Sequence, residues 1–175
     1  MKESIDKFVK YASSLDGDEK GEAQVFCDRL FQAFGHDGYK EAGATLEFRV
    51  KSKKKTNFAD LLWGERVLIE MKKKGAKLPS HRTQIFDYWW KLRPNQPKYS
   101  VLCNFSEFII YDFALQDEPL DRIKLEELPD RYTAFNFMLP KAATPIFENN
   151  LEAATRETAD LVAKVFNSLL ERGEN

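Results

Sequence analysis

The 175 residues amount to 20.3 kDa, which fits one ordinary globular domain and excludes two independent catalytic domains. The apolar share of 43%, with fourteen phenylalanines, six tyrosines and three tryptophans, excludes intrinsic disorder and supplies a packed core. The sequence has no run of about 18 apolar residues and begins with charged ones, so we expect neither a membrane span nor a signal peptide, and a cytoplasmic location.

Charge is distributed unevenly along the chain, although the net charge is only −1. Residues 49–98 hold fourteen lysines and arginines against four acidic residues, a local balance of +10, and the remainder carries −11. Such segregation predicts a positive field that attracts a polyanion such as DNA. A run such as Lys53-Lys54-Lys55 is more often a solvated turn than a binding site, so the charge pattern alone does not establish nucleic-acid binding.

The cysteines and histidines do not form a metal-binding pattern. Cys27 and Cys103 lie far apart, which is typical of buried thiols in a reducing compartment rather than of a zinc site. His36 follows a helix-ending glycine and His81 lies near a helix start, so each is expected to be exposed or capping rather than catalytic.

Two amphipathic helices are predicted at the start of the chain, over residues 3–15 and from about Glu19 to Phe34. Gly35 marks the end of the second. Strands are predicted at Leu46 to Val50, Asn57 to Trp63 and Val67 to Lys72, with a basic turn over residues 51–55. Gly64-Glu65-Arg66 joins the last two strands as a hairpin connection.

The rest of the chain predicts a helix from Pro79 to about Leu92, strands at Tyr99 to Cys103 and Phe108 to Phe113, a short helix near Asp130 to Met138, and a long helix from Leu151 to about Leu170. This order predicts an α/β domain with a mixed central sheet of about five strands flanked by helices, and the third strand near its centre. The single domain covers residues 1–175, with a core over about 18–115 and a C-terminal helical extension over about 120–172.

Three charged residues interrupt the apolar strands of the predicted hairpin. Asp60 lies in one strand, and Glu70 and Lys72 lie in the next, two residues apart and therefore on one face. Burying a carboxylate costs roughly several kcal/mol of folding free energy unless a cation compensates its charge. Two carboxylates in otherwise apolar strands therefore suggest a bound metal ion. A structural ion pair within the hairpin is the alternative explanation.

Phosphodiester hydrolysis requires a hard cation that neutralises charge on the phosphate and generates hydroxide. Magnesium prefers a few carboxylates and keeps several waters, so Asp60 and Glu70 are the expected ligands, with the main-chain carbonyl of Met71 as a further one. Lys72 would orient the attacking water, assist its deprotonation, or stabilise charge on the phosphorane-like state.

The pattern Asp60-x9-Glu70-x-Lys72 resembles the PD-(D/E)XK nuclease superfamily, although Asn57-Phe58-Ala59-Asp60 departs from the Pro-Asp of that name. Gln84 and Tyr88, one helical turn apart, resemble the Q-x3-Y motif of RecB-type nucleases. Glu22 matches the acidic residue that many such nucleases place near the metal. The resemblance thus implies catalytic roles for these three residues as well.

Three further segments, Gly43 to Val50, Phe58 to Leu61 and Leu128 to Tyr132, resemble the N-terminal endonuclease domain of MmeI-like type IIL restriction-modification enzymes. The resemblance covers most of the chain and implies a restriction-endonuclease-like fold and Mg²⁺-dependent cleavage of double-stranded DNA, with Mn²⁺ as a substitute. It also implies methyltransferase and target-recognition domains as partners in the same or an associated polypeptide. Neither a glycine-rich cofactor loop nor an Asn-Pro-Pro-Tyr motif occurs in this sequence.

Other interpretations remain open at this point. Tyr88 is also explained by packing with Trp89, Gln84 by a surface position, and Glu22 by a favourable interaction with the helix dipole. The alternative functions are a standalone RecB-like repair nuclease and a catalytically silent DNA-binding or assembly module. Intact Asp60, Glu70 and Lys72 argue against the silent module.

Overall fold

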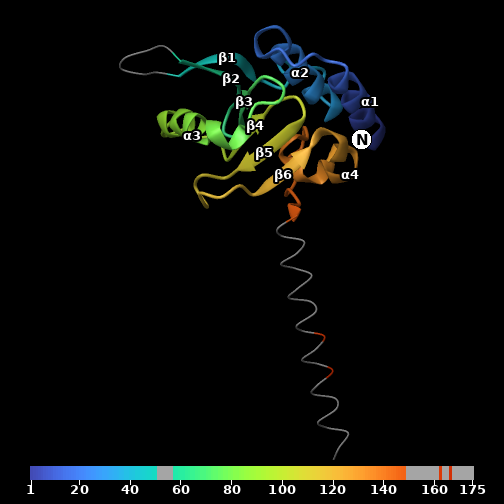
Figure 1. Ribbon diagram of the computed structural model, residues 1–175. Helices are drawn as coiled ribbons and strands as arrows, with labels where there is room; N and C mark the ends of the chain where they lie inside the picture. The colour runs from blue at the N-terminus through green and yellow to red at the C-terminus, as the bar shows by residue number, and fades with distance from the viewer. Residues whose placement is uncertain (51–56, 149–161, 163–165, 167–175) are drawn as a thin grey trace, which may run out of the picture.

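The computed structural model describes residues 1–50 and 57–148, together with residues 162 and 166. Within this part of the chain, a sheet is covered by helices on both faces (Figure 1). The predicted basic turn over residues 51–55 lies outside the described residues, and so does the predicted helix over residues 151–170, apart from its two described positions.

The sheet has six strands in the order in which they occur along the chain. They are β1 (Thr45–Val50), β2 (Asn57–Trp63), β3 (Val67–Met71), β4 (Tyr99–Cys103), β5 (Glu107–Tyr111) and β6 (Asp121–Lys124). Neighbouring strands are antiparallel except for β3 and β4, which are parallel. The α/β class with a mixed sheet and a central third strand is therefore confirmed.

The predicted number of strands was one too low, because β6 was missed. This strand has only four residues, and Arg122 and Lys124 on its outer side are exposed while Asp121 and Ile123 are buried. Asp121 is buried as a charged residue because the guanidinium of Arg131 donates to both of its carboxylate oxygens, each at 2.8 Å. A short strand that begins with a buried aspartate lacks the apolar signal by which strands are recognised.

Three helices cover one face of the sheet (Figure 1). They are α1 (Lys2–Ser13), α2 (Glu19–Ala33) and the short α4 (Leu128–Arg131). The predicted helix near residues 130–138 is instead α4 followed by a 3₁₀ helix, Tyr132–Met138. Asp18 caps α2 by accepting from the backbone N–H groups of Lys20 and Gly21, and Gly35 follows the helix with a φ of +93°.

The opposite face is covered by α3 (Arg82–Lys91), which follows a 3₁₀ turn at Leu78–His81. Two apolar cores result, one on each side of the sheet, and every residue of β3 is buried between them. The thiols of Cys27 and Cys103 are free and buried in the first core, as expected. No helix in the described ranges is both long enough and apolar enough to cross a membrane.

The β1–β2 hairpin changes the face on which its side chains pack. Leu46 and Leu61 pack against the first core, whereas Phe48 and Ala59, which pair across the two strands, pack against the second. Glu47 lies at this change and has a φ of +48°, a left-handed conformation that is uncommon for a residue with a side chain. We call the part beyond it, residues 48–50 and 57–59, the β-arm.

Candidate active site

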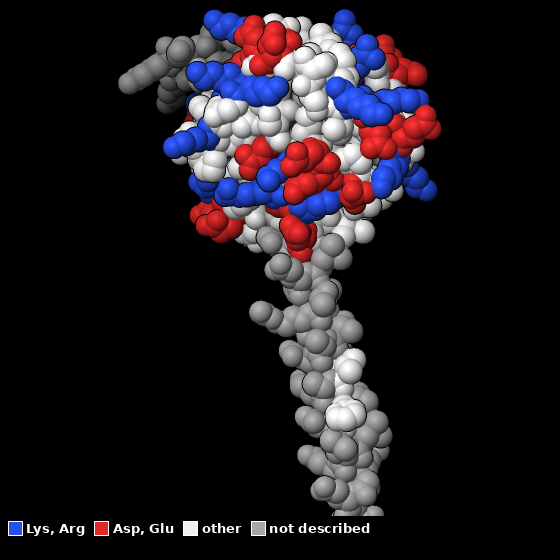
Figure 2. All heavy atoms as spheres, turned by 45° about the vertical axis from the view of Figure 1, so that its right-hand side comes forward, with Lys and Arg blue, Asp and Glu red and all other residues white. Residues whose placement is uncertain are grey.

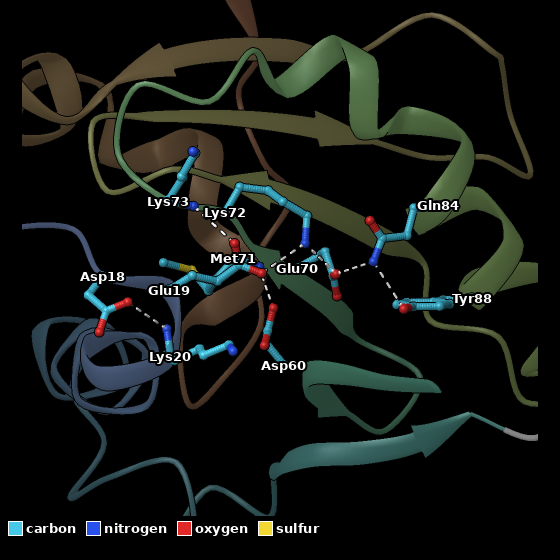
Figure 3. Close-up of polar contacts among 10 residues, drawn as sticks. All are labelled: Asp18, Glu19, Lys20, Asp60, Glu70, Met71, Lys72, Lys73, Gln84 and Tyr88. Atoms are coloured by element: carbon cyan, nitrogen blue, oxygen red, sulfur yellow. Dashed lines mark hydrogen bonds and ion pairs between the residues drawn. The ribbon is translucent and has the colours of Figure 1, made fainter. Parts of the chain in front are cut away.

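The site forms where β2 and β3 separate. The two strands pair as far as Leu61 and Ile69, and Asp60 and Glu70 are the next residues on each strand. Beyond that point the Asp60 side chain takes the place of a backbone partner, because its Oδ2 accepts a hydrogen bond from the backbone N–H of Met71 at 2.7 Å (Figure 3). A charged side chain thus lies at a position where the backbone groups of a strand need a partner.

Glu70 and Lys72 project from β3 toward the side of the sheet on which α3 packs. Their residues are only 2% and 6% exposed, and the Lys72 Nζ donates to Glu70 Oε1 at 2.8 Å. The predicted shared face of these two residues is therefore confirmed. Leu68, two residues earlier on the same face, packs into the second core, which explains why the two charged groups are buried.

Gln84 connects α3 to the two charged residues. Its Nε2 donates to Glu70 Oε1 at 2.7 Å and to the Tyr88 hydroxyl at 3.0 Å (Figure 3). Tyr88 is buried, and Ile85 and Trp89 beside it fix α3 against the sheet. Gln84 therefore faces the site rather than the surface, and Tyr88 both packs in the core and presents its hydroxyl to Gln84.

The acidic residue of α2 at the site is Glu19, not Glu22. Glu19 Oε1 accepts from the Lys72 Nζ at 3.3 Å, and its Oε2 accepts from the backbone N–H of Lys73 at 3.2 Å. The Glu22 carboxylate instead accepts from the backbone N–H groups of Asp16, Gly17 and Asp18, just before the helix begins. The structure therefore brings Glu19, and not Glu22, into contact with Lys72, and the catalytic role expected for Glu22 stays a prediction.

Helical spacing alone could not make this distinction. Glu19 and Glu22 both lie in the first turn of α2, and which of them meets β3 depends on how the helix packs on the sheet. One sequence signal was available. Asp18 is a favourable N-cap, so Glu19 is the first residue of the helix, and its side chain is not needed to cap the helix.

Burial raises the pKa of Glu70 from its ordinary value of 4.5 to about 7, and the Asp60 carboxylate adds to the effect, while Lys72 opposes it. Burial also raises the pKa of Asp60, although the Met71 N–H and Lys72 favour its charged form. Because Glu70 is harder to ionise in the folded than in the unfolded chain, its contribution to stability is complete below pH 4.5 and is lost as the pH rises through about 7.

Lys72 has a pKa above its ordinary value of 10.5. Burial by itself lowers this pKa, but the carboxylates of Glu70, Glu19 and Asp60 together more than offset that effect. The side chain is therefore a cation at neutral pH. It is better suited to stabilising negative charge than to accepting a proton from water.

A pocket of about 340 Å³ opens beside Asp60, on the side of α2. Its lining residues are Glu19, Lys20, Ala23, Gln24, Glu47 and Asp60. In the described part of the chain, no group of three or more His, Cys, Asp or Glu side chains is gathered as a ready metal site. Glu70 Oε2, however, is buried and has no hydrogen-bond partner among the described residues, and Asp60 supplies a second carboxylate nearby. This donor set suits a hard divalent cation.

The charge around the site is mixed. Figure 2 shows acidic and basic side chains interspersed over one face of the molecule, separated by uncharged surface, so that face is not uniformly positive. The four lysines at positions 51, 53, 54 and 55 lie outside the described residues. Among the described ones, Lys20 and Lys73 are exposed close to the Asp60 pocket.

The two histidines have different surroundings: His36 packs against other parts of the chain, and His81 precedes α3. His36 is half-buried, its Nε2 lies 2.7 Å from the Met138 carbonyl oxygen, and its ring contacts Phe31 and Trp63. His81 precedes α3 as its N-cap residue but makes no capping hydrogen bond with its side chain. The expected exposed or capping role is therefore wrong for His36, which packs against distant parts of the chain.

Comparison with known proteins gives one family. Residues 2–172 match the family described as MmeI, N-terminal domain. Neither the search of curated proteins nor the search of solved structures gave a match. The matched range includes all strands of the sheet and every residue of the site. The chain therefore belongs to the MmeI N-terminal domain family.

Proposed function

We propose that this chain is a Mg²⁺-dependent endonuclease domain of the PD-(D/E)XK type, with a restriction-endonuclease-like fold, which hydrolyses phosphodiester bonds in double-stranded DNA. One observation carries the proposal. The buried carboxylate of Glu70 has an unpartnered oxygen, and it lies beside Asp60 and Lys72 at the point where two central strands separate. A fold retains such a costly group more readily when a ligand compensates it.

The two carboxylates would hold the cation. Asp60 and Glu70 would be its ligands, together with the main-chain carbonyl of Met71, and Mn²⁺ would substitute for Mg²⁺. When bound, the cation neutralises charge on the phosphate and lowers the pKa of a bound water. Glu19 lines the pocket next to Asp60, so its carboxylate also contributes to the negative field that attracts the cation.

Lys72 would act on the phosphate and the attacking water. Its ammonium is held between Glu70 at 2.8 Å and Glu19 at 3.3 Å, which fixes the Nζ beside the carboxylates. Since this group is cationic at neutral pH, we assign to it orientation of the water and stabilisation of the charge that develops on the phosphate oxygens. Such a donor is most effective when it is fixed before the reaction.

Gln84 would be a positioning residue. One amide N–H group donates to Glu70 Oε1 and leaves Oε2 free, and the hydrogen bond with the Tyr88 hydroxyl fixes the amide's orientation. The residues of the Q-x3-Y pattern would thus act through Glu70.

The Gln84–Tyr88 pair can be tested without disturbing the core. Tyr88→Phe keeps the buried ring and removes only the hydroxyl, so we expect cleavage to fall roughly fivefold, as for loss of one neutral hydrogen bond of about 1 kcal/mol, with a melting temperature close to that of the wild type. Gln84→Ala should reduce cleavage further. Single-turnover cleavage rates and thermal unfolding of both variants provide the measurement. Full activity in both would return this helix to a purely structural role.

Family membership supports a wider assignment of the domain. We propose that it is the cleavage module of a type IIL restriction-modification system, in which methyltransferase and target-recognition domains belong to the same or an associated polypeptide. Those domains would recognise the DNA sequence, because the residues of the site described above would act on the phosphate and would not read base edges. The domain alone would then bind DNA weakly and with strong salt dependence.

Dependence on a divalent cation tests the proposal directly. A supercoiled plasmid incubated with the protein should be nicked or linearised in Mg²⁺ or Mn²⁺, and addition of a chelator should stop the reaction. The matched control is the same preparation of the Glu70→Gln variant, which has the same size but lacks the anionic ligand. Cleavage that continues in excess chelator, or that Glu70→Gln retains in full, would contradict a metal-dependent mechanism at this site.

A further inference from the structure

The two sides of the β-arm have opposite characters. On the inner side, Phe48, Val50 and Ala59 pack against the second core. On the outer side, Arg49 and Phe58 face each other across the two strands, and Arg49 is exposed. Phe58 is 51% exposed, although it lies within a strand and is followed by the buried Ala59. An exposed aromatic ring thus lies beside an exposed arginine of the edge strand β1.

This outer side is continuous with the site. Phe58 precedes Ala59, which packs on the second core, and therefore points to the opposite side of the sheet, the side of α2 on which Asp60 lines its pocket. Arg49 and Glu47 lie on that same side, because Phe48 between them packs on the second core. Asp60 and Glu47 line the same pocket. The exposed ring therefore lies on the same side of the sheet as the pocket that opens beside Asp60.

Arg49, the charged residue of the β-arm, and the basic sequence that follows it point to an anionic partner. Between Arg49 and Phe58 the sequence contains four lysines and no acidic residue. Figure 1 shows the ends of β1 and β2 at the margin of the molecule, with β1 as the edge strand. A cationic edge also opposes pairing with the same strand of a second copy, which makes self-association through this edge less favourable.

We propose that the outer side of the β-arm is a DNA-docking surface, on which Phe58 packs against a sugar or base of the substrate and Arg49 contacts an adjacent phosphate. The inference rests on the proposed nuclease function, which it deepens by naming the surface that positions the substrate. An aromatic ring supplies apolar contact with any base or sugar, and the arginine supplies charge, so neither contact depends on sequence.

The spacing of the residues suits a DNA strand. Phe58 and Asp60 are two residues apart in β2, which corresponds to about 7 Å at a strand rise of roughly 3.3 Å per residue. Phosphates of one DNA strand follow one another at roughly 3.4 Å along the helix axis. For a DNA strand that runs along β2, Phe58 would therefore contact the substrate within about two nucleotides of the phosphate at Asp60, close enough to orient the scissile bond.

Binding and cleavage of a short duplex test the proposal separately. Fluorescence anisotropy with a labelled 20-base-pair duplex, roughly two helical turns, in Ca²⁺ in place of Mg²⁺, would give the affinity over a series of salt concentrations. Phe58→Ser should weaken binding about tenfold without changing the salt dependence, as loss of one aromatic contact predicts. Arg49→Gln should reduce the slope of log affinity against log salt by about 0.9, the value for one phosphate contact.

Matched variants elsewhere on the surface provide the controls. Leu115→Ser removes an apolar side chain that is 70% exposed in the segment after β5, and Arg122→Gln removes an exposed arginine on β6, at the opposite edge of the sheet. Both should bind DNA like the wild type. Equal affinity of Phe58→Ser and Leu115→Ser, or an unchanged salt slope in Arg49→Gln, would overturn the proposal. So would a Phe58→Ser variant that changes only the oligomeric state in sedimentation equilibrium.

The design separates this inference from the proposed function. If the wild type cleaves in Mg²⁺ and the β-arm variants bind and cleave as well as it does, the docking surface is wrong and the nuclease assignment stands. If the wild type binds DNA through Phe58 and Arg49 but does not cleave in any divalent cation, the docking surface stands and the nuclease assignment fails.

Discussion

Lys72→Ala should abolish detectable cleavage while the domain still folds and binds DNA. Removing one fixed donor from a site of this kind lowers the rate by roughly 10²–10³-fold, and here the lost group is also the cation that is hydrogen-bonded to Glu70. The fold should tolerate the change. Without Lys72 the pKa of Glu70 rises further, so this buried carboxyl takes up a proton at neutral pH rather than remaining as an uncompensated charge.

Single-turnover cleavage, DNA anisotropy and urea unfolding of the same preparations would measure the three properties. Lys73→Ala is the matched control, because its side chain is exposed and only its backbone N–H contacts Glu19. We expect the control to cleave at close to the wild-type rate. A Lys72→Ala protein that retains wild-type cleavage would show that the lysine belongs to a structural ion pair, and would favour another location for the chemistry.

Asp60 can be tested by two substitutions that separate its two roles. Asp60→Asn keeps an oxygen that can accept from the Met71 N–H, whereas Asp60→Ala leaves that donor without its side-chain partner. Both variants should lose metal binding and at least about 10²-fold in cleavage, since a ligand charge is removed in each. Only Asp60→Ala should also lose stability, by about 1–3 kcal/mol, the usual penalty for an unsatisfied buried donor.

Calorimetric titration with Mn²⁺ and urea unfolding would separate these effects. Lys72→Ala belongs in the same titration, because it should retain most of the Mn²⁺ affinity that both Asp60 variants lose. Asp37→Asn, a charge change at an exposed position, is a suitable control. Equal loss of Mn²⁺ affinity in Lys72→Ala and Asp60→Asn would contradict the division into a ligand and a charge-stabilising residue.

The sequence predicts the β2–β3 part of the site well because this part is local. Asp60, Glu70 and Lys72 lie within one hairpin, so the connection and the alternation of side chains are enough to bring Glu70 and Lys72 to one face. Gln84 required one long-range assumption, namely that α3 packs on that same face. The apolar residues at helical spacing in α3 and the continuous apolar run of β3 made that assumption a reasonable one.

The remainder depends on packing that spacing does not encode. Glu19 reaches Lys72 only because α2 crosses the sheet with its first turn over the end of β3, and a helical wheel treats Glu19 and Glu22 alike. Asp121 in β6 is stabilised by Arg131, ten residues away, so a residue that argues against a strand in the sequence is accommodated in the fold. In both cases the packing of one element against another, rather than spacing along a single element, decides where the charged group lies.

The agreement between strand order and chain order bears on how the domain forms. Adjacent strands follow each other along the sequence, and only the step from β3 to β4 requires a crossover, which α3 supplies. Most loops that must close are therefore short, and their entropic cost is small. The hairpin bearing Asp60 and Glu70 closes through only three residues, Gly64 to Arg66. The carboxylates of Asp60 and Glu70 can thus be brought together early in folding, before the helices on either face of the sheet have docked.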